Sequence, residues 1–177
     1  MELKAPPLFL DSCAMIVAFE HASDAQRRLR RLFWPREGSQ IPAAMTSELT
    51  VAECMVKPFR DRNAELINLY DFWFGRAGGD VLQLVPIGRV VMEVSAIVRA
   101  KYNSLKLPDA IQIAAAVVHG AQLFLTGDKR LAGTYDLTYH WPEWTGMGSI
   151  SPHPISTFDI GQSDWTEVES QLARMPS

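Results

Sequence analysis

Four acidic residues are spaced along this chain so that a parallel α/β sheet would bring them together: Asp11, Glu53, Asp109 and Asp128. The first follows the apolar residues 8–10 and the last comes shortly after the apolar residues 123–125, so both are expected at the ends of buried strands. Asp109 stands at the expected start of a helix, and Glu53 lies on the apolar face of another. Because ligands of open α/β sheets bind outside the carboxyl ends of the strands, we expect the four side chains to meet there.

A pocket with four carboxylates predicts a particular kind of chemistry. Neighbouring negative charges repel one another, and a bound divalent cation is the usual remedy. Carboxylate oxygens and water are ligands that suit Mg²⁺ or Mn²⁺. Such an ion polarises a phosphoryl oxygen and lowers the pKa of a bound water, which then attacks in line. The pattern therefore predicts metal-dependent hydrolysis of phosphodiester bonds.

Each acid also has a purely structural explanation. Asp11 can cap a helix, and Asp109 can interact with a helix dipole. Asp128 can belong to an ordinary turn, and Glu53 can extend its carboxylate to water. These alternatives are strong for each residue taken singly. They weaken together, because all four acids would have to converge on one sheet edge by accident.

Alternating strand and helix patterns position these acids. Strands are expected at residues 8–10, 41–45, 81–87 and 123–125. Helices are expected after Asp11, from Ser23, from Thr46 until Pro58 ends it, and at residues 62–76, 90–100 and 109–118. This alternation predicts an α/β fold, a three-layer α/β/α sandwich with a mostly parallel sheet.

The end of the chain has a different character. Residues 141–163 are rich in Trp, Pro and Gly and predict an irregular surface arm, after which Ser163 and Asp164 would cap one last helix through Leu172. We therefore expect a domain at residues 1–140 and a C-terminal extension at residues 141–177. The extension is too apolar for a free tail, so it should pack on the domain or on a partner.

Composition bounds the kind of protein. With 17 basic and 20 acidic residues the net charge is −3, which argues against a protein that coats nucleic acid by charge and allows an enzyme with a local patch. Neither Cys13 nor Cys54 belongs to a CxxC pair or a zinc ligand set, which favours a reduced, cytoplasmic chain. No apolar stretch is long enough to span a membrane, and Asp11 interrupts the run that an export signal would need.

Four segments, in this order and at this spacing, resemble the PIN-domain (PilT N-terminal) nucleases, most closely their VapC-type toxins. The segments are LFLDS at 8–12, TSELTVAE at 46–53, LPDAIQIAAA at 107–116 and LFLTGDKRL at 123–131. The resemblance implies Mg²⁺ or Mn²⁺, cleavage of single-stranded RNA, frequent homodimers and a cognate antitoxin protein. It places the catalytic and metal-binding positions at the four acids and a hydroxyl, Thr126, beside the last of them.

Other polar residues near the acids are candidates for binding substrate: Ser12, Thr126, Lys129 and Arg130. The two cations either contact a phosphate or form a charged surface turn. The arginines at positions 27, 28, 30 and 31 share one helix face, which either guides RNA or is simply solvated.

Two other functions compete with a ribonuclease. A haloacid-dehalogenase-like phosphatase also begins with a strand and an Asp, but its Asp-x-Asp pattern is broken here because Cys13 occupies the third position. A catalytically inactive PIN-like module that binds RNA or protein is the second alternative. The presence of all four acids speaks against it.

Overall fold

A six-stranded sheet forms the centre of the molecule. The computed structural model describes residues 8–32, 44–75, 81–140, 149–150, 154–161 and 165–174. The strands of the sheet are β1 (Leu8–Leu10), β2 (Ala44–Ser47), β3 (Leu82–Val85), β4 (Leu123–Thr126), β5 (Gly133–Tyr135) and β8 (Ile155–Asp159). Their order is β3-β2-β1-β4-β8-β5, and every neighbouring pair is parallel except β8 with β5. A separate two-stranded ribbon joins β6 (Tyr139–His140) to β7 (Ser149–Ile150).

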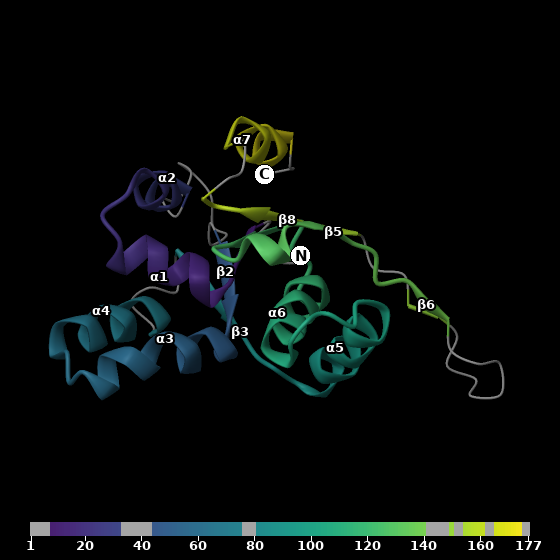
Figure 1. Ribbon diagram of the computed structural model, residues 1–177, viewed down its shortest axis with the longest axis horizontal. Coiled ribbons are helices and arrows are strands. Elements are labelled where there is room, and N and C mark those ends of the chain that lie inside the picture. Colours follow the sequence, from purple (N-terminus) through teal and green to yellow (C-terminus); the bar gives the residue numbers. More distant parts are fainter. Residues whose placement is uncertain are drawn as a thin grey trace, which may run out of the picture.

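Helices cover both faces of this sheet (Figure 1). They are α1 (Ser12–Glu20), α2 (Asp24–Leu32), α3 (Glu48–Arg60), α4 (Ala64–Phe74), α5 (Arg89–Lys101), α6 (Leu107–Val118) and α7 (Trp165–Arg174). The predicted three-layer α/β/α sandwich with a mostly parallel sheet is confirmed. Within the described ranges, no helix has the length and apolar character needed to cross a membrane.

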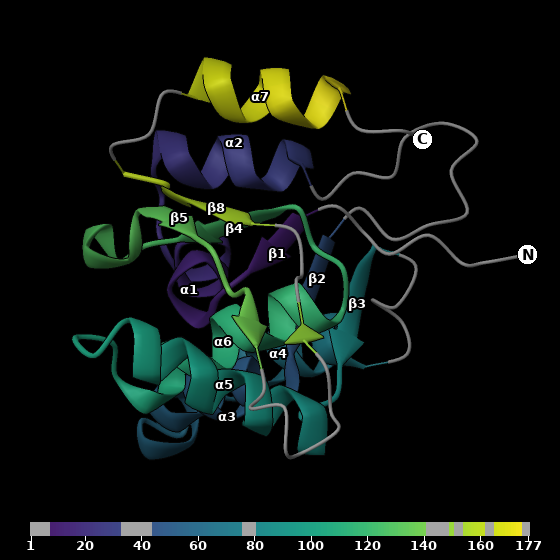
Figure 2. The same ribbon diagram turned by 90° about the vertical axis from the view of Figure 1, so that its right-hand side faces the viewer.

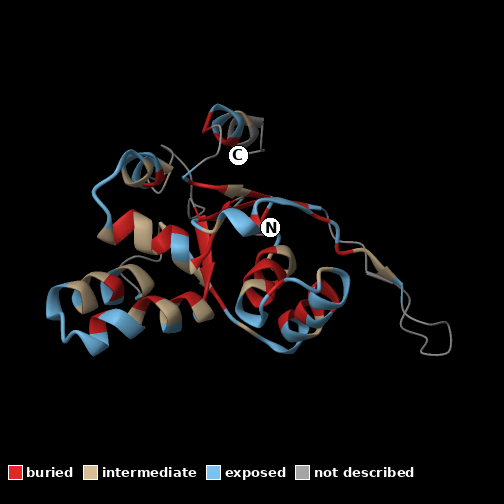
Figure 3. Cartoon of the chain, viewed as in Figure 1, coloured by how far each residue is buried: buried red, intermediate tan, exposed pale blue. Residues whose placement is uncertain are grey.

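Successive side chains of the central strands point to opposite faces of the sheet and so divide the hydrophobic core into two clusters. Leu8 and Leu10 face one cluster with α1, α2, α4 and α7, whereas Phe9 faces the other with α5 and α6. The Phe9 and Phe124 rings of neighbouring strands stack there, 5.3 Å between centroids. Figure 3 shows the central strands buried and the outer faces of the helices exposed, and β1, β2 and β4 are buried along their whole length. Burial on both faces explains why these strands are continuous apolar runs.

Two helix boundaries differ from those expected. The prediction that Pro58 ends its helix is wrong, because α3 continues to Arg60. A proline in the last turn removes one N–H donor but has a φ that fits the helix, and the Asp61 N–H still donates to the Lys57 carbonyl, 2.9 Å away. In addition, α6 begins at Leu107, so Asp109 lies in its first turn rather than at its start.

The C-terminal segment contributes a strand to the sheet. The expectation of an irregular arm at 141–163 is wrong for Ile155–Asp159, which forms β8. It pairs in parallel with β4, with Leu123 opposite Ser156 and Thr126 opposite Asp159. The strand is stable there because it covers an otherwise open edge of β4. The expected cap residues, 163 and 164, lie outside the described residues, as do 141–148 and 41–43.

Helix α7 lies beside α2 (Figure 2). Trp165 and Val168 are buried in the same core cluster as Leu29 of α2. The Arg28 guanidinium stands over the Trp165 ring, 5.8 Å from its centroid, which is a cation–π arrangement. Arg30 donates from Nε to the Ala18 carbonyl, 3.1 Å away. Two of the four arginines on this face of α2 therefore contact other parts of the same chain.

Replacing Trp165 by alanine should lower the free energy of unfolding by about 3 kcal/mol, because the variant loses a buried ring that joins α7 to α2. Urea denaturation of the full chain measures this difference. Glu169→Ala changes an exposed residue of the same helix and should stay within about 0.5 kcal/mol of the parent. Equal stability of both variants would mean that α7 contributes little to the fold.

Candidate active site

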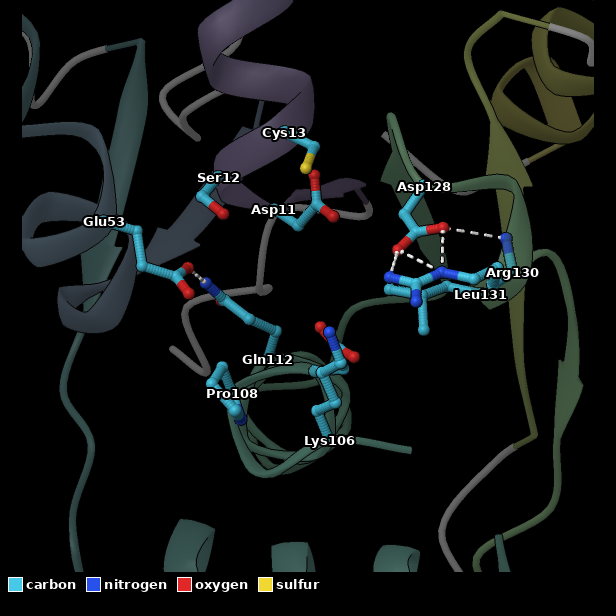
Figure 4. A pocket seen from close by; sticks show the side chains of 11 residues that line it. Asp11, Ser12, Cys13, Glu53, Lys106, Pro108, Gln112, Asp128, Arg130 and Leu131 are labelled. Atoms are coloured by element: carbon cyan, nitrogen blue, oxygen red, sulfur yellow. Dashed lines mark hydrogen bonds and ion pairs between the residues drawn. The ribbon is translucent and has the colours of Figure 1, made fainter. Parts of the chain in front are cut away.

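One cavity at the carboxyl edge of the sheet receives all four predicted acids (Figure 4). Its volume is about 250 Å³. The lining residues are Asp11, Ser12, Cys13, Glu53, Lys106, Pro108, Asp109, Gln112, Asp128, Arg130 and Leu131. The acids come from the end of β1, from α3, from α6 and from the turn after β4. Ser12 and Arg130, two of the candidate substrate-binding residues, also line it, whereas Thr126 and Lys129 do not.

Asp11 is held by its backbone and by both carboxylate oxygens. It caps α1 in an extended conformation, and its Oδ1 accepts from the Ala14 N–H, 2.7 Å away. Its Oδ2 accepts from the Thr126 hydroxyl. Asp11 is 4% exposed, and burial raises its pKa to about 7, with the charges of Glu53 and Asp109 adding to the rise and the two hydrogen bonds opposing it. Asp11 therefore both caps α1 and lines the cavity.

Thr126 acts on Asp11 rather than facing the cavity. The side chain is fully buried, its hydroxyl donates to Asp11, and its Oγ1 accepts from the Asp128 N–H, 2.9 Å away. Because this hydroxyl donates to one residue of the site and accepts from another, it orients both of them. This geometry favours positioning over the direct contact with substrate expected for Thr126.

Glu53 projects into the cavity from α3. Its Oε2 accepts from the Gln112 side-chain amide, 3.1 Å away. Asp109 is half-buried in the first turn of α6, one turn before Gln112, and also lines the cavity. Lys106 precedes this turn as the N-cap residue of α6 and also lines the cavity. The sequence pattern did not indicate Lys106 or Gln112, although a lone polar residue inside the apolar run 110–116 is a signal for the latter.

Asp128 is paired with a cation of its own turn. The Arg130 guanidinium donates to both of its carboxylate oxygens, from Nε at 2.9 and 3.0 Å and again from Nη2. These hydrogen bonds hold the pKa of Asp128 below its ordinary value. The preceding Gly127 is required by close packing, since a Cβ there would lie 2.9 Å from the Cβ of Cys13. The turn therefore fits tightly beside α1.

The donor set fits a divalent cation in its chemistry. Asp11, Glu53 and Asp109 have no salt bridge to a lysine or arginine within the described ranges. Burial and like charge raise the pKa of Asp11, and a cation beside it would offset both effects. Over the same ranges, no three acidic, histidine or cysteine side chains are grouped closely enough to hold one ion as they stand. Binding of one ion by several of these side chains would therefore require some of them to move. Opening of the Asp128–Arg130 ion pair is a movement that would free a carboxylate.

The family model described as PIN domain matches residues 8–137. A chain of a toxin–antitoxin complex from Klebsiella pneumoniae is similar at 25% identity and a TM-score of 0.52, over 71% of this chain and 91% of that one. The sarcin-ricin loop cleaving toxin VapC20 of Mycobacterium tuberculosis shares the fold at 18% identity and a TM-score of 0.52, over 69% and 90%.

A third solved structure shares the fold as well. It is VapBC2 of Rickettsia felis bound to a DNA fragment from its promoter, at 12% identity and a TM-score of 0.51, over 70% of this chain and 89% of that one. A search of curated proteins gave no match. The family model spans well over half of the chain and all four acids, and the fold agrees with it. This chain belongs to the PIN domain family, whose members are nucleases.

Proposed function

We propose that this chain is a metal-dependent endoribonuclease that hydrolyses phosphodiester bonds of single-stranded RNA, with Mg²⁺ or Mn²⁺ as its cofactor. The observation that carries the proposal is the meeting of four carboxylates from four separate elements in one cavity. Membership of a family of nucleases supports the reaction class. The same match removes the basis for a phosphatase of the haloacid-dehalogenase kind.

Each residue of the cavity then has a role. Asp11, Glu53, Asp109 and Asp128 are the carboxylates that hold the ion. When bound, the ion polarises a phosphoryl oxygen and makes a coordinated water more acidic. Thr126 keeps the Asp11 carboxylate in one orientation through its hydroxyl. Asp128 becomes a free ligand when Arg130 exchanges it for another anion, and a phosphate of the substrate is such a partner.

Single-stranded RNA is the substrate that this surface favours. Lys106 and Arg130 line the cavity, and Lys129 is exposed beside it, so a few cations surround the acids. The chain as a whole carries a net charge of −3 and lacks the excess of basic residues typical of proteins that hold a duplex by its phosphates. A cavity of about 250 Å³ suits one phosphodiester of a flexible strand.

We further propose that the chain is the cytoplasmic toxin of a toxin–antitoxin pair and forms a homodimer. The likeness to the Klebsiella pneumoniae toxin–antitoxin complex supports this, since 91% of that chain is covered. Exposed apolar side chains on α3 and α4 provide a surface for protein contact: Val56, Phe59 and Phe72. The antitoxin is the proposed protein partner.

Purified protein should cleave a labelled single-stranded RNA in Mn²⁺ and leave a duplex of the same sequence intact. EDTA should stop cleavage because the carboxylates then lack their cation, and excess Mn²⁺ should restore it. Gel analysis of the products over time measures both effects. Binding of the RNA without any cleavage, in Mg²⁺ and in Mn²⁺, would instead identify the inactive PIN-like module.

A further inference from the structure

Gln112 is a buried amide between the two helices that carry Glu53 and Asp109. It is 3% exposed and lies in α6 among apolar neighbours. Its Nε2 donates to Glu53 Oε2 at 3.1 Å and to Thr50 Oγ1 at 3.0 Å. Its Oε1 accepts from the Ser47 hydroxyl at 2.7 Å. Figure 4 shows the amide reaching from α6 across to the Glu53 carboxylate.

The orientation of this amide is fixed by the chemistry of its partners. An ionised carboxylate only accepts hydrogen bonds, so the NH₂ group must face Glu53. The Ser47 hydroxyl donates to the amide oxygen on the opposite side and so holds the amide from behind. The network continues inward, since the Thr46 and Thr50 hydroxyls lie 2.8 Å apart and Thr46 donates to the Leu10 carbonyl at 2.7 Å. It thus ends at the residue before Asp11.

A neutral donor has a different effect on a carboxylate from a cation. Arg130 neutralises Asp128, and both oxygens of Asp11 accept hydrogen bonds. Glu53 is held through one oxygen by a neutral amide, and the ranges described contain no salt bridge to it. The amide therefore restricts where the carboxylate points while the full negative charge and the Oε1 atom remain available to a ligand.

We propose that Gln112 is the positioning residue for Glu53. Its amide, locked by Ser47, aims the Glu53 carboxylate into the cavity and ties α3 to α6, so that Glu53 and Asp109 keep a fixed separation. This role rests on the proposed function, in which Glu53 is one of the carboxylates that hold the metal ion. Hydrogen bonds from groups behind metal ligands commonly tune metal affinity 10- to 100-fold.

The first test measures Mn²⁺ binding through its effect on the melting temperature. Gln112→Leu removes the amide at similar volume, and the Mn²⁺ concentration that gives half the rise should increase about 10-fold. Ser47→Ala is a milder variant that leaves the amide present but unlocked, and it should cause a smaller increase of about 3-fold. The matched control is Ser95→Ala, a buried serine of α5 that donates to the Met92 carbonyl, which should not change the midpoint.

The same substitutions in a Glu53→Gln background separate positioning from general damage. If Gln112 acts through Glu53, Gln112→Leu should shift the Mn²⁺ midpoint by less than about 2-fold once Glu53 is already neutral. An equal shift in both backgrounds would overturn the proposal, because Gln112 would then support the fold rather than Glu53. Ser47→Ala in the two backgrounds decides the question in the same way where Gln112→Leu fails to fold.

A second measurement needs no metal. In ¹⁵N NMR spectra of the full chain, the Gln112 side-chain amide should move strongly on Glu53→Gln and little on Asp109→Asn. If the amide responds in this way while Mn²⁺ leaves the melting temperature unchanged, the positioning contact stands and the metal-dependent function fails. If the Gln112 side-chain amide signal did not move on Glu53→Gln, the positioning role would be overturned, whatever the effect of Mn²⁺ on the melting temperature.

Discussion

Asp11→Asn should reduce the rate of RNA cleavage by at least about 1,000-fold, equivalent to about 4 kcal/mol in the activation free energy. The substitution keeps the shape of the side chain and, since Asn caps helices as well as Asp does, it keeps the start of α1. It removes the negative charge at the most buried of the four carboxylates. Single-turnover cleavage of labelled RNA measures the loss, and expression of the variant should no longer slow cell growth.

A suitable control for this loss is Asp24→Asn, which changes an exposed acid in the first turn of α2. Its cleavage rate should equal that of the parent. If folded Asp11→Asn protein cleaved RNA at the parental rate, Asp11 would serve only as the cap of α1. Slowed growth with the inactive variant would separate the toxin role from cleavage and count against the proposed function.

In EDTA, the protein should become less stable relative to Asp11→Asn as the pH rises from 5 to 8. Burial raises the pKa of Asp11 from 3.8 to about 7 in the folded state. The stability that the protonated carboxyl contributes is therefore complete below pH 3.8 and lost as the pH rises through about 7. The shift corresponds to an upper limit of about 4 kcal/mol. Urea denaturation of both proteins across this pH range measures the difference.

Stabilisation by Mn²⁺ should follow the opposite trend. The ion binds the ionised carboxylate, so the rise in melting temperature should grow between pH 6 and pH 8, where Asp11 loses its proton. Asp11→Asn should show a smaller rise with a weaker pH dependence. A stability difference that stays constant across the pH range would show that Asp11 ionises without penalty and does not lie in a desolvated, negatively charged cavity.

Local patterns were sufficient to predict most of the fold. The runs at 8–10 and 123–125 are apolar throughout because β1 and β4 are buried on both faces. β8 was not foreseen because its pattern is weak locally. Ile155, Thr157 and Asp159 are buried, yet two of the three are polar. The Thr157 hydroxyl donates to the Leu131 and Gly133 carbonyls, which are more than 20 positions away in the sequence. A strand specified by such tertiary contacts carries little signal in its own residues.

The candidate site, too, could be predicted only in part from the sequence. The positions of the four acids follow from motifs at strand ends and helix starts, and all four line one cavity. The hydrogen-bond partners of these acids were not apparent from the motifs. The pairing of Asp128 with Arg130 depends on the shape of a short turn, and the contact of Gln112 with Glu53 joins residues 59 positions apart. The contact of Gln112 with Glu53 depends on the tertiary arrangement that brings α3 and α6 to the same cavity.

The place of β8 in the sheet has a consequence for synthesis of the protein. β8 is the last strand of the sheet in the chain, yet it lies between β4 and β5. On the ribosome, β1 to β4 emerge first, and the edge of β4 that precedes Asp128 stays unpaired until residue 159 has been made. The turn that carries Asp128 therefore gains its neighbouring strand only after residues 155–159 have been made.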